Sequence, residues 1–137
     1  MFGGCRAGKI NVYGSDLSFK REITGIGTYP RKIQFDSNDL IRVPDYYGHT
    51  VYVITKCGRI VKTIAVPDII HAEGLFVDSN DNMYISDRND PGSVHVVSND
   101  GSEVLQLTGY KGVGDAVVAP DGTLWVSDYL GGKIYLH

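Results

Sequence analysis

Apolar and polar residues alternate in short runs along this chain, and turn residues separate the runs. Apolar residues recur two positions apart, as in Val51 with Val53 and in Val94 with Val96. A period of two is typical of β-strands, whose side chains point alternately to the two faces of a sheet. Between the runs stand turn sequences such as Ser-Asn-Asp-Gly at 98–101, which tolerate the positive φ angles of tight hairpins. The pattern predicts an all-β protein.

A stretch of twelve residues occurs three times in altered form. It reads QFDSNDLIRVPD at 34–45, FVDSNDNMYISD at 76–87 and VVAPDGTLWVSD at 117–128. The spacing between the copies is 42 and then 41 residues. A repeat of this length is typical of propeller blades or of paired-helix arrays, and the period of two favours strands over helices. We therefore predict a β-propeller of four-stranded antiparallel blades.

Each complete copy contains four segments long enough for a strand, which we name A to D in chain order. In the two complete copies they are 32–35, 40–44, 50–54 and 59–64, then 74–77, 83–86, 94–97 and 103–107. The chain ends add segments C and D at 9–13 and 17–23, and segments A to C at 116–119, 124–127 and 134–136. These thirteen strands make about three and a quarter blades, which are too few to close a ring.

The sequence therefore predicts a single partial propeller domain over residues 1–137. Its predicted divisions are the C and D strands of a first blade, two complete blades and the A to C strands of a last blade, at 9–24, 25–66, 67–109 and 110–137. Two interpretations stay open. The chain is a piece of a longer protein, or two copies of it form a homodimer that closes one ring.

The repeat resembles the NHL-repeat β-propeller. The residues that carry the resemblance are 76–78, 83–87 and 94–96 in one copy and 121–128 and 134–136 in the next. It extends over nearly the whole chain, from about residue 9 to 136. Streptogramin-lyase-like, gluconolactonase-like and low-density-lipoprotein-receptor-type propellers have a similar unit. The resemblance implies a ring of about six blades, of which this chain would supply roughly half.

Composition fits one packed domain and excludes some partners. The chain has 137 residues, 42% of them apolar, and a formal net charge of −3. This charge offers no basic stripe for a phosphate backbone, so nucleic acid is not expected as a partner. No apolar run approaches the roughly 20 residues that span a bilayer, and residues 1–14 do not resemble a secretory signal. We expect no membrane span in this chain, and its compartment stays open.

The two cysteines, Cys5 and Cys57, are too few for a disulfide framework and lack metal-ligand spacing. Cys5 precedes a segment C, whereas Cys57 lies in a C–D turn. These places are on opposite rims of a propeller, so we predict no disulfide between them.

Positions that are the same in every copy indicate what each blade needs for folding. Asp45, Asp87 and Asp128 end segment B in the three copies. We predict that each accepts hydrogen bonds from backbone N–H groups of its B–C loop, because such groups are paired when buried. The alternative, a row of catalytic acids, would require partner residues that differ between the copies.

The stretch from Asp78 to Asn82 resembles the beginning of an EF-hand calcium loop. That loop requires Gly at its sixth position and Glu at its twelfth, where this chain has Met83 and Asn89. We therefore predict an A–B turn and not a calcium site.

Positions that differ between the copies are where a site could be built. In a propeller, the D–A and B–C loops share one rim around the central channel, which is the usual functional face. The candidates on the D–A loops are Tyr29, Arg31, His71, Glu73 and Asp115. The candidates on the B–C loops are Tyr46, Tyr47, His49, Arg88, Asp90, Tyr129 and Lys133.

Tyr and Arg are the usual anchors of binding surfaces, so the rim predicts a binding module for a protein or a small-molecule ligand. The absence of a complete catalytic constellation favours binding over catalysis, and no cofactor is expected. The alternative is a lyase or lactonase with a divalent metal such as zinc or calcium near the channel. His71 and Glu73 could supply two ligands, although a catalytic zinc takes three. In the simplest interpretation Glu73 pairs weakly with Arg31.

Overall fold

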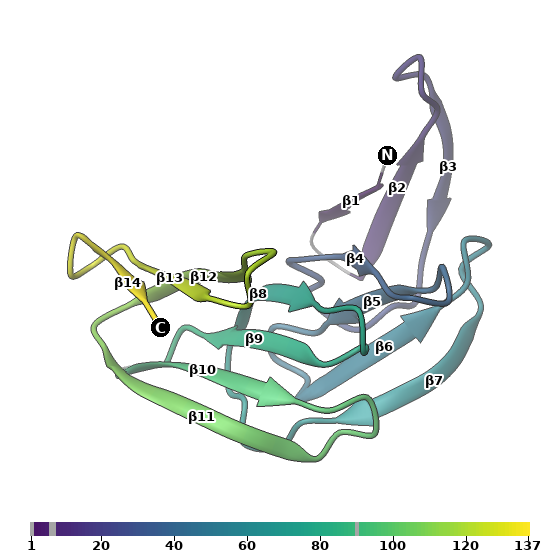
Figure 1. Cartoon of the computed structure of the whole chain (residues 1–137). Helices are drawn as coiled ribbons and strands as arrows, with labels where there is room; N and C mark the ends of the chain where they lie inside the picture. Colours follow the sequence, from purple (N-terminus) through teal and green to yellow (C-terminus); the bar gives the residue numbers. More distant parts are fainter. Residues whose placement is uncertain (1, 6–7, 90) are drawn as a thin grey trace.

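The computed structural model describes residues 2–5, 8–89 and 91–137 (Figure 1). These residues form fourteen strands in four antiparallel sheets, which we call the first to fourth blades. The first blade contains β1 (Phe2–Cys5), β2 (Lys9–Tyr13) and β3 (Phe19–Ile23). The second contains β4 (Gln34–Phe35), β5 (Ile41–Pro44), β6 (Thr50–Ile54) and β7 (Ile60–Ala65). None of the described residues forms a helix that could cross a membrane.

The third and fourth blades continue the same pattern. The third contains β8 (Ala72–Val77), β9 (Met83–Asp87), β10 (Gly92–Val97) and β11 (Glu103–Tyr110). The fourth contains β12 (Val113–Val118), β13 (Leu124–Asp128) and β14 (Lys133–Leu136). In every blade each strand pairs with the strand that precedes it in the chain. Short hairpins are sufficient for such connections, which agrees with the turn sequences between the runs.

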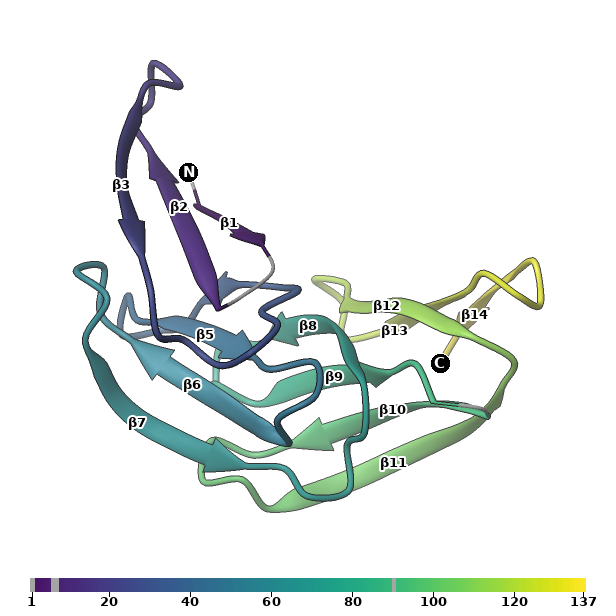
Figure 2. The ribbon, with the colours of Figure 1, turned by 180° about the vertical axis from the view of Figure 1, so that it is seen from behind.

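The four blades follow one another along a curved arc, with the first and the fourth at its ends (Figures 1 and 2). The A strands are neighbours along this arc, since β4 contacts β8 and β8 contacts β12. This arrangement of successive sheets is that of a partial propeller. The predicted fold class, all-β with four-stranded antiparallel blades, is confirmed.

One strand was missed by the sequence pattern. β1 pairs with β2, so the first blade contains segments B, C and D and not only C and D. Its sequence, FGGC, has two adjacent glycines and no alternation of apolar and polar residues. Glycine weakens strand propensity, so the period of two is not visible there. The thirteen predicted strands are all present, and the total of fourteen corresponds to three and a half blades.

The blades pack against one another through three apolar clusters. The cluster between the first and second blades contains Ile10, Ile23, Ile26, Ile41, Val43 and Ile54. Between the second and third blades lie residues such as Val51, Val53, Leu75, Met83 and Ile85. Between the third and fourth blades lie Val94, Tyr110, Val113, Ala116, Leu124 and Val126. Each such aliphatic side chain contributes about 1.5–3 kcal/mol on burial, so these layers hold the arc together.

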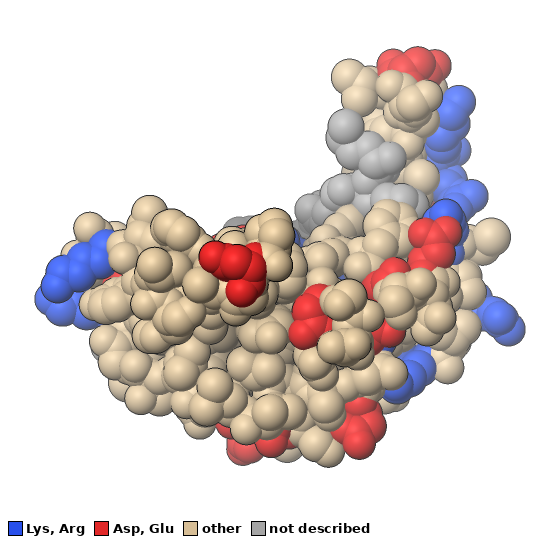
Figure 3. Space-filling model, in the orientation of Figure 1, with Lys and Arg blue, Asp and Glu red and all other residues tan. Residues whose placement is uncertain are grey.

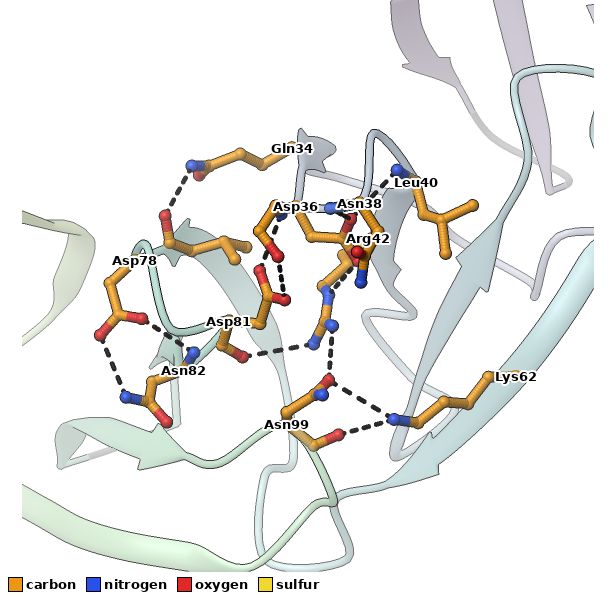
Figure 4. Close-up of polar contacts among 12 residues, drawn as sticks. Gln34, Asp36, Asn38, Leu40, Arg42, Lys62, Asp78, Asp81, Asn82 and Asn99 are labelled. Carbon is orange, nitrogen blue, oxygen red and sulfur yellow. Dashed lines mark hydrogen bonds and ion pairs between the residues drawn. The ribbon is translucent and has the colours of Figure 1, made fainter.

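A buried polar network also joins the second and third blades (Figure 4). Its centre is Arg42 of β5, whose side chain is only 3% exposed. Nε of Arg42 donates to Asp36 at 3.1 Å, and its two terminal nitrogens donate to the Asp81 carbonyl at 3.4 Å and to the Asn99 side chain at 2.5 Å. The network therefore connects the A–B turn of the second blade with the A–B and C–D turns of the third.

The A–B turns in this network are themselves fixed by aspartates. Asp78 accepts hydrogen bonds from the backbone N–H groups of Asn80 and Asn82, both at 2.9 Å, so this segment is the turn that the sequence predicted. Asp81 accepts from the backbone and the hydroxyl of Ser37 in the neighbouring blade. Burial alone would raise the pKa of Asp81, but the bonds from Ser37 together with the charges of Arg42 and Lys62 outweigh burial and hold that pKa below its usual range. These contacts lock the two turns together.

Charged side chains gather unevenly on the surface. In the view of Figure 3, lysines and arginines follow the outer edge of the first blade and gather at the far end of the fourth, and acidic side chains are spread over the tip of the first blade and over the other three. Most of the remaining surface in this view is uncharged. The layers between the blades are mainly apolar and most charges lie at the edges and turns, although Arg42 and Asp36 are buried where the second and third blades meet.

Candidate functional site

The B–C and D–A loops of each blade meet at the same rim. A backbone hydrogen bond from the residue after segment B to the D–A loop repeats in three blades. The backbone N–H of Tyr46 donates to the carbonyl of Tyr29 at 3.1 Å. In the next two blades, the N–H of Arg88 donates to the carbonyl of His71 at 2.9 Å and that of Tyr129 to the carbonyl of Gly112 at 3.0 Å. The repeat therefore places equivalent pairs of side chains along one rim of the arc.

The aspartate at the end of segment B fixes this meeting point. Asp87 is 2% exposed and accepts hydrogen bonds from the backbone N–H groups of Ile70 and His71 at 2.9 and 3.0 Å. Asp45 and Asp128 accept equivalent bonds from Thr28, Tyr29, Lys111 and Gly112. The donors lie mainly in the D–A loop and not, as predicted, in the B–C loop. The B–C loop adds one bond each to two of the aspartates, from Asn89 and Gly131. The D–A loop supplies most donors because it crosses the end of segment B.

Two glycines that sequence reasoning missed make room for these carboxylates. A Cβ added to Gly48 would lie 2.3 Å from Oδ2 of Asp45, and one added to Gly131 would lie 2.6 Å from Oδ2 of Asp128. The signal was visible as Asp-x-x-Gly in two copies of the repeat. In the third blade the same position is Asp90, a candidate rim residue that lies outside the described residues.

Four aromatic rings from the second and third blades touch one another at the rim. We call Tyr29, Tyr46, Tyr47 and His71 the rim aromatic cluster. The rings of Tyr46 and His71 are stacked at 4.9 Å, and Tyr47 meets Tyr46 edge-on at 4.7 Å. Tyr46 is only 9% exposed, whereas Tyr47 is 58% exposed. Each such aromatic pair stabilises the fold by about 0.5–1.5 kcal/mol beyond the effect of burial. The buried ring of Tyr46 therefore helps to hold the exposed ring of Tyr47 in place.

An ion pair crosses the rim aromatic cluster. A terminal nitrogen of Arg31 lies 2.8 Å from Oε1 of Glu73, as the simplest interpretation of the sequence predicts. The Arg31 guanidinium also lies 5.6 Å from the ring centre of Tyr29 and 5.2 Å from that of Tyr46. The second carboxylate oxygen of Glu73 is buried and has no hydrogen-bond partner among the described residues. An unpaired buried acceptor costs about 1–3 kcal/mol, so this oxygen is suited to a donor from a ligand.

A second arginine extends the rim toward the fourth blade. Nε of Arg88 donates to the hydroxyl of Tyr129 at 2.8 Å, and this bond raises the pKa of Arg88. The guanidinium lies 5.3 Å from the ring centre of Tyr129, which is 49% exposed. Tyr46, Arg88 and Tyr129 each follow the invariant aspartate of their own blade. They therefore form a Tyr–Arg–Tyr row along the rim. Burial is the main reason that the pKa of Tyr46 is raised.

The other candidate residues lie apart from the rings. His49 has a φ of 54° and its Nδ1 lies 2.7 Å from the Ile69 carbonyl, so it connects two loops. Because a carbonyl only accepts, Nδ1 must carry the proton. Asp115 pairs with Lys32 at 3.1 Å and thereby links the fourth blade to the second. Lys133 is exposed at the beginning of β14.

The described residues contain no group of three or more His, Cys, Asp or Glu side chains that could hold a metal ion. His71 is stacked on Tyr46, and Glu73 is engaged by Arg31. A metal bound by His71 and Glu73 stays a hypothesis. Cys57 is a free and exposed thiol. The side chain of Cys5 lies outside the described residues.

Three solved structures resemble this fold. Virginiamycin B lyase from Staphylococcus aureus superposes with a TM-score of 0.70 at 17% identity, over 96% of this chain and 48% of that one. A catalytically inactive variant of that lyase with quinupristin gives a TM-score of 0.76 at 14% identity, over 98% and 51%. A protein of unknown function from Bacteroides caccae gives 0.70 at 15% identity, over 98% and 52%.

No protein-family model matches the chain. No curated protein sequence matches it either. The chain spans about half the length of the solved structures that it resembles. At these identities the likeness concerns the fold alone. It does not test the NHL-repeat assignment or the six-bladed ring, which stay predictions. The chain therefore has the fold of a partial β-propeller, similar to about half of the virginiamycin B lyase structure.

Proposed function

We propose that this chain is a propeller binding module whose rim aromatic cluster and Arg88 bind a protein or small-molecule ligand. The observation that carries the proposal is the contact of four rings from two neighbouring blades, at repeat positions whose residues differ between blades. Invariant positions of the repeat serve folding, as Asp87 does. The variable positions that gather at one rim are therefore available for recognition.

The rim has the properties of a binding surface. The ring of Tyr47 is exposed but held from behind by Tyr46 and His71, so little conformational entropy is lost when a ligand covers it. Tyr129 uses only the Nε donor of Arg88, and a guanidinium carries four further N–H donors. These donors suit a carboxylate or another anionic group, which a guanidinium binds in bidentate fashion. The rim therefore fits a ligand in which an anionic group neighbours an apolar or aromatic one.

The test compares matched variants on the two rims. The rim variant combines Tyr47→Ala, Arg88→Gln and Tyr129→Ala, and it spares Tyr46 because that ring is buried. The control combines Phe35→Ala and Lys56→Gln, which remove an exposed ring and the cation 5.6 Å from its centre on the opposite rim. An array of peptides and an array of glycans serve as probes. We expect the rim variant to lose at least about tenfold in affinity, or about 1.4 kcal/mol. Equal binding by both variants to every probe that the parent binds would refute the proposal.

A lyase or lactonase with a divalent metal near the channel is the second candidate. The observation in its favour is the unpaired buried oxygen of Glu73, two residues from His71. Calorimetric titration of the chain with zinc, calcium and manganese tests it, with Glu73→Gln as the control. Stoichiometric binding that Glu73→Gln abolishes would support this candidate. Binding below one ion per chain for all three metals would reject it.

A further inference from the structure

The third blade buries a histidine between two carboxylates. His95 of β10 is 1% exposed and pairs with Ile85, a member of the apolar cluster between the second and third blades. Each of these two blades has four strands, so the histidine is enclosed from both sides. We propose that His95 is a pH-sensitive device. Its protonation draws on the carboxylate of Asp87 and thereby loosens the D–A loop that contains Ile70 and His71.

Both ring nitrogens of His95 have partners. Nδ1 lies 2.9 Å from Oε2 of Glu103 on β11, and Nε2 lies 3.0 Å from the hydroxyl of Ser93. Because an ionised carboxylate only accepts hydrogen bonds, Nδ1 carries the proton of the neutral ring. Nε2 of the neutral ring therefore accepts a hydrogen bond from Ser93. Nε2 is also the atom that gains a proton when the ring becomes a cation.

The atom that gains the proton lies near the carboxylate that fixes the loop. Nε2 of His95 is 3.8 Å from Oδ2 of Asp87, which ends β9. The same Oδ2 accepts the backbone N–H of Ile70 at 2.9 Å, whereas Oδ1 accepts those of His71 and Asn89. A neutral Nε2 offers Asp87 no donor. A protonated Nε2 offers an N–H and a positive charge, and a small movement of the carboxylate would complete a charge-assisted hydrogen bond.

Oδ2 of Asp87 would then be shared between His95 and Ile70. The bond from the Ile70 N–H should lengthen as the carboxylate moves toward the cation. A backbone hydrogen bond that is weakened in this way opens more often. Protonation of His95 is therefore expected to change the D–A loop next to the rim aromatic cluster.

The charged groups that contact His95 are acidic, among the described residues. Asp87 lies on β9 and Glu103 on β11, and Asp68 of the D–A loop lines the same depression of about 120 Å³ as Glu103. Neighbouring negative charges favour a protonated ring, whereas burial opposes it. The side chain of Glu103 is 32% exposed, so it connects the buried ring with the solvent that supplies the proton.

The second blade provides an internal comparison. Tyr52 pairs with Val43 as His95 pairs with Ile85, so the two residues are equivalent. A Cβ added to Gly27 would lie 2.7 Å from Oδ2 of Asp45 and 3.1 Å from the ring of Tyr52, so this ring is also close to the aspartate of its blade. Phenol groups ordinarily titrate near pH 10, whereas a histidine changes its charge between about pH 5 and pH 8. The device is therefore specific to the third blade of this pair.

An NMR titration of the full chain between about pH 5 and pH 8 tests the proposal. It follows the ring of His95 and the backbone amides of Ile70 and Thr28. Thr28 is the matched control, because its N–H donates to Oδ2 of Asp45 at 3.0 Å as that of Ile70 donates to Asp87. The Ile70 amide signal should shift with the same midpoint as the protonation of His95, and the Thr28 signal should stay constant.

Variants separate His95 from the other histidines near the loop. His95→Tyr introduces the residue of the second blade and should abolish the shift of the Ile70 signal. His71 follows Ile70 in the chain, and Nδ1 of His49 lies 2.7 Å from the Ile69 carbonyl. His71→Phe and His49→Asn should therefore each retain the shift, with its midpoint still that of His95.

A ring of His95 that keeps one protonation state over the whole titration would overturn the proposal. So would a shift of the Ile70 signal that persists in His95→Tyr, or one that Thr28 shares. The titration of the parent chain decides the matter even if His95→Tyr does not fold. No ligand is added, so the result is independent of the proposed binding function.

Discussion

The two rims of the arc use the same residue types in opposite ways. At the A–B and C–D turns, the Arg42 side chain is 3% exposed, and each of its nitrogens contacts an acceptor (Figure 4). At the B–C and D–A loops, the Arg31 side chain is 33% exposed and pairs with one oxygen of Glu73. A buried arginine whose three nitrogens all contact acceptors is not accessible to a ligand, whereas a partly exposed one with neighbouring rings is.

This difference indicates that the two rims have different roles, stability at the A–B and C–D turns and recognition at the B–C and D–A loops. Buried polar networks are costly to break and stabilise one arrangement of the elements that they join. Partly exposed ion pairs contribute little to stability, so their residues can change between blades. The rim of the A–B and C–D turns, here the turn rim, holds the second and third blades together. The rim of the B–C and D–A loops, here the loop rim, is available for recognition. The following predictions test whether the two rims differ in this way.

The largest effect is expected from Arg42→Met. The substitution leaves the buried carboxylate of Asp36, which is 1% exposed, without its cation. Breaking a buried ion pair on one side costs about 3–5 kcal/mol, so the free energy of unfolding should fall by that amount. Urea denaturation followed by circular dichroism measures it.

Lys62→Met is the matched control for Arg42→Met. Lys62 is exposed and donates to the same Asn99 at 2.9 Å. Because contacts of exposed charges contribute about 0–1 kcal/mol, the control should remain nearly as stable as the parent. Equal losses in the two variants would show that burial is not what distinguishes Arg42.

A smaller but clear loss is expected from Asp87→Ala. The change leaves three backbone N–H groups without their acceptor, those of Ile70, His71 and Asn89. We expect the free energy of unfolding to fall by about 2–3 kcal/mol, and hydrogen exchange of these amides to accelerate. If exchange at His71 were unchanged, the aspartate would not be what fixes the loop rim.

Acid should weaken the loop rim through Asp128. The backbone N–H of Lys111 is the main cause that holds the pKa of Asp128 below its usual range. A carboxyl group whose folded pKa is depressed stabilises the fold above its unfolded pKa of about 4, and this stability is lost as the pH falls through the folded pKa. The free energy of unfolding should therefore decrease below about pH 4.

Asp128→Asn should flatten that pH dependence, measured by urea denaturation between about pH 2 and pH 7. Asp100 contributes a separate loss near its own pKa of about 2, which the Ser98 hydroxyl lowers. A pH profile of Asp128→Asn that is as steep as that of the parent would contradict this assignment.

The smallest effect is expected for the pair of Arg31 and Glu73. A double-mutant cycle with Arg31→Met and Glu73→Gln should give a coupling free energy of about 0–1 kcal/mol, because the arginine is one-third exposed. A coupling above about 2 kcal/mol would mean that this rim also depends on its ion pair for stability.

The sequence predicted the fold through the period of two and the 41- to 42-residue repeat. It did not predict β1, because its glycines carry no alternation. It placed Tyr46 and His71 at the rim, but their stacking depends on the angle between neighbouring blades, which no single repeat encodes. Arg42 stands where the other copies have Tyr84 and Trp125.

The partners of Arg42 were not predictable in the same way. Asn99 lies 57 residues further along the chain, in a C–D turn of the next blade. A repeat pattern assigns each position a place within its own blade, so contacts between blades require the packing itself.

The most direct test of ligand binding at the B–C and D–A loops is hydrogen exchange of the chain with and without the array probe that binds best. We expect slower exchange on binding in segments 27–31, 45–49 and 70–74, which contain the B–C and D–A loops. We expect no change in segments 36–39, 79–82 and 98–101, which contain the A–B and C–D turns. Slower amide exchange in the turn-rim segments with unchanged exchange in the loop-rim segments would contradict the assignment of ligand binding to the loop rim.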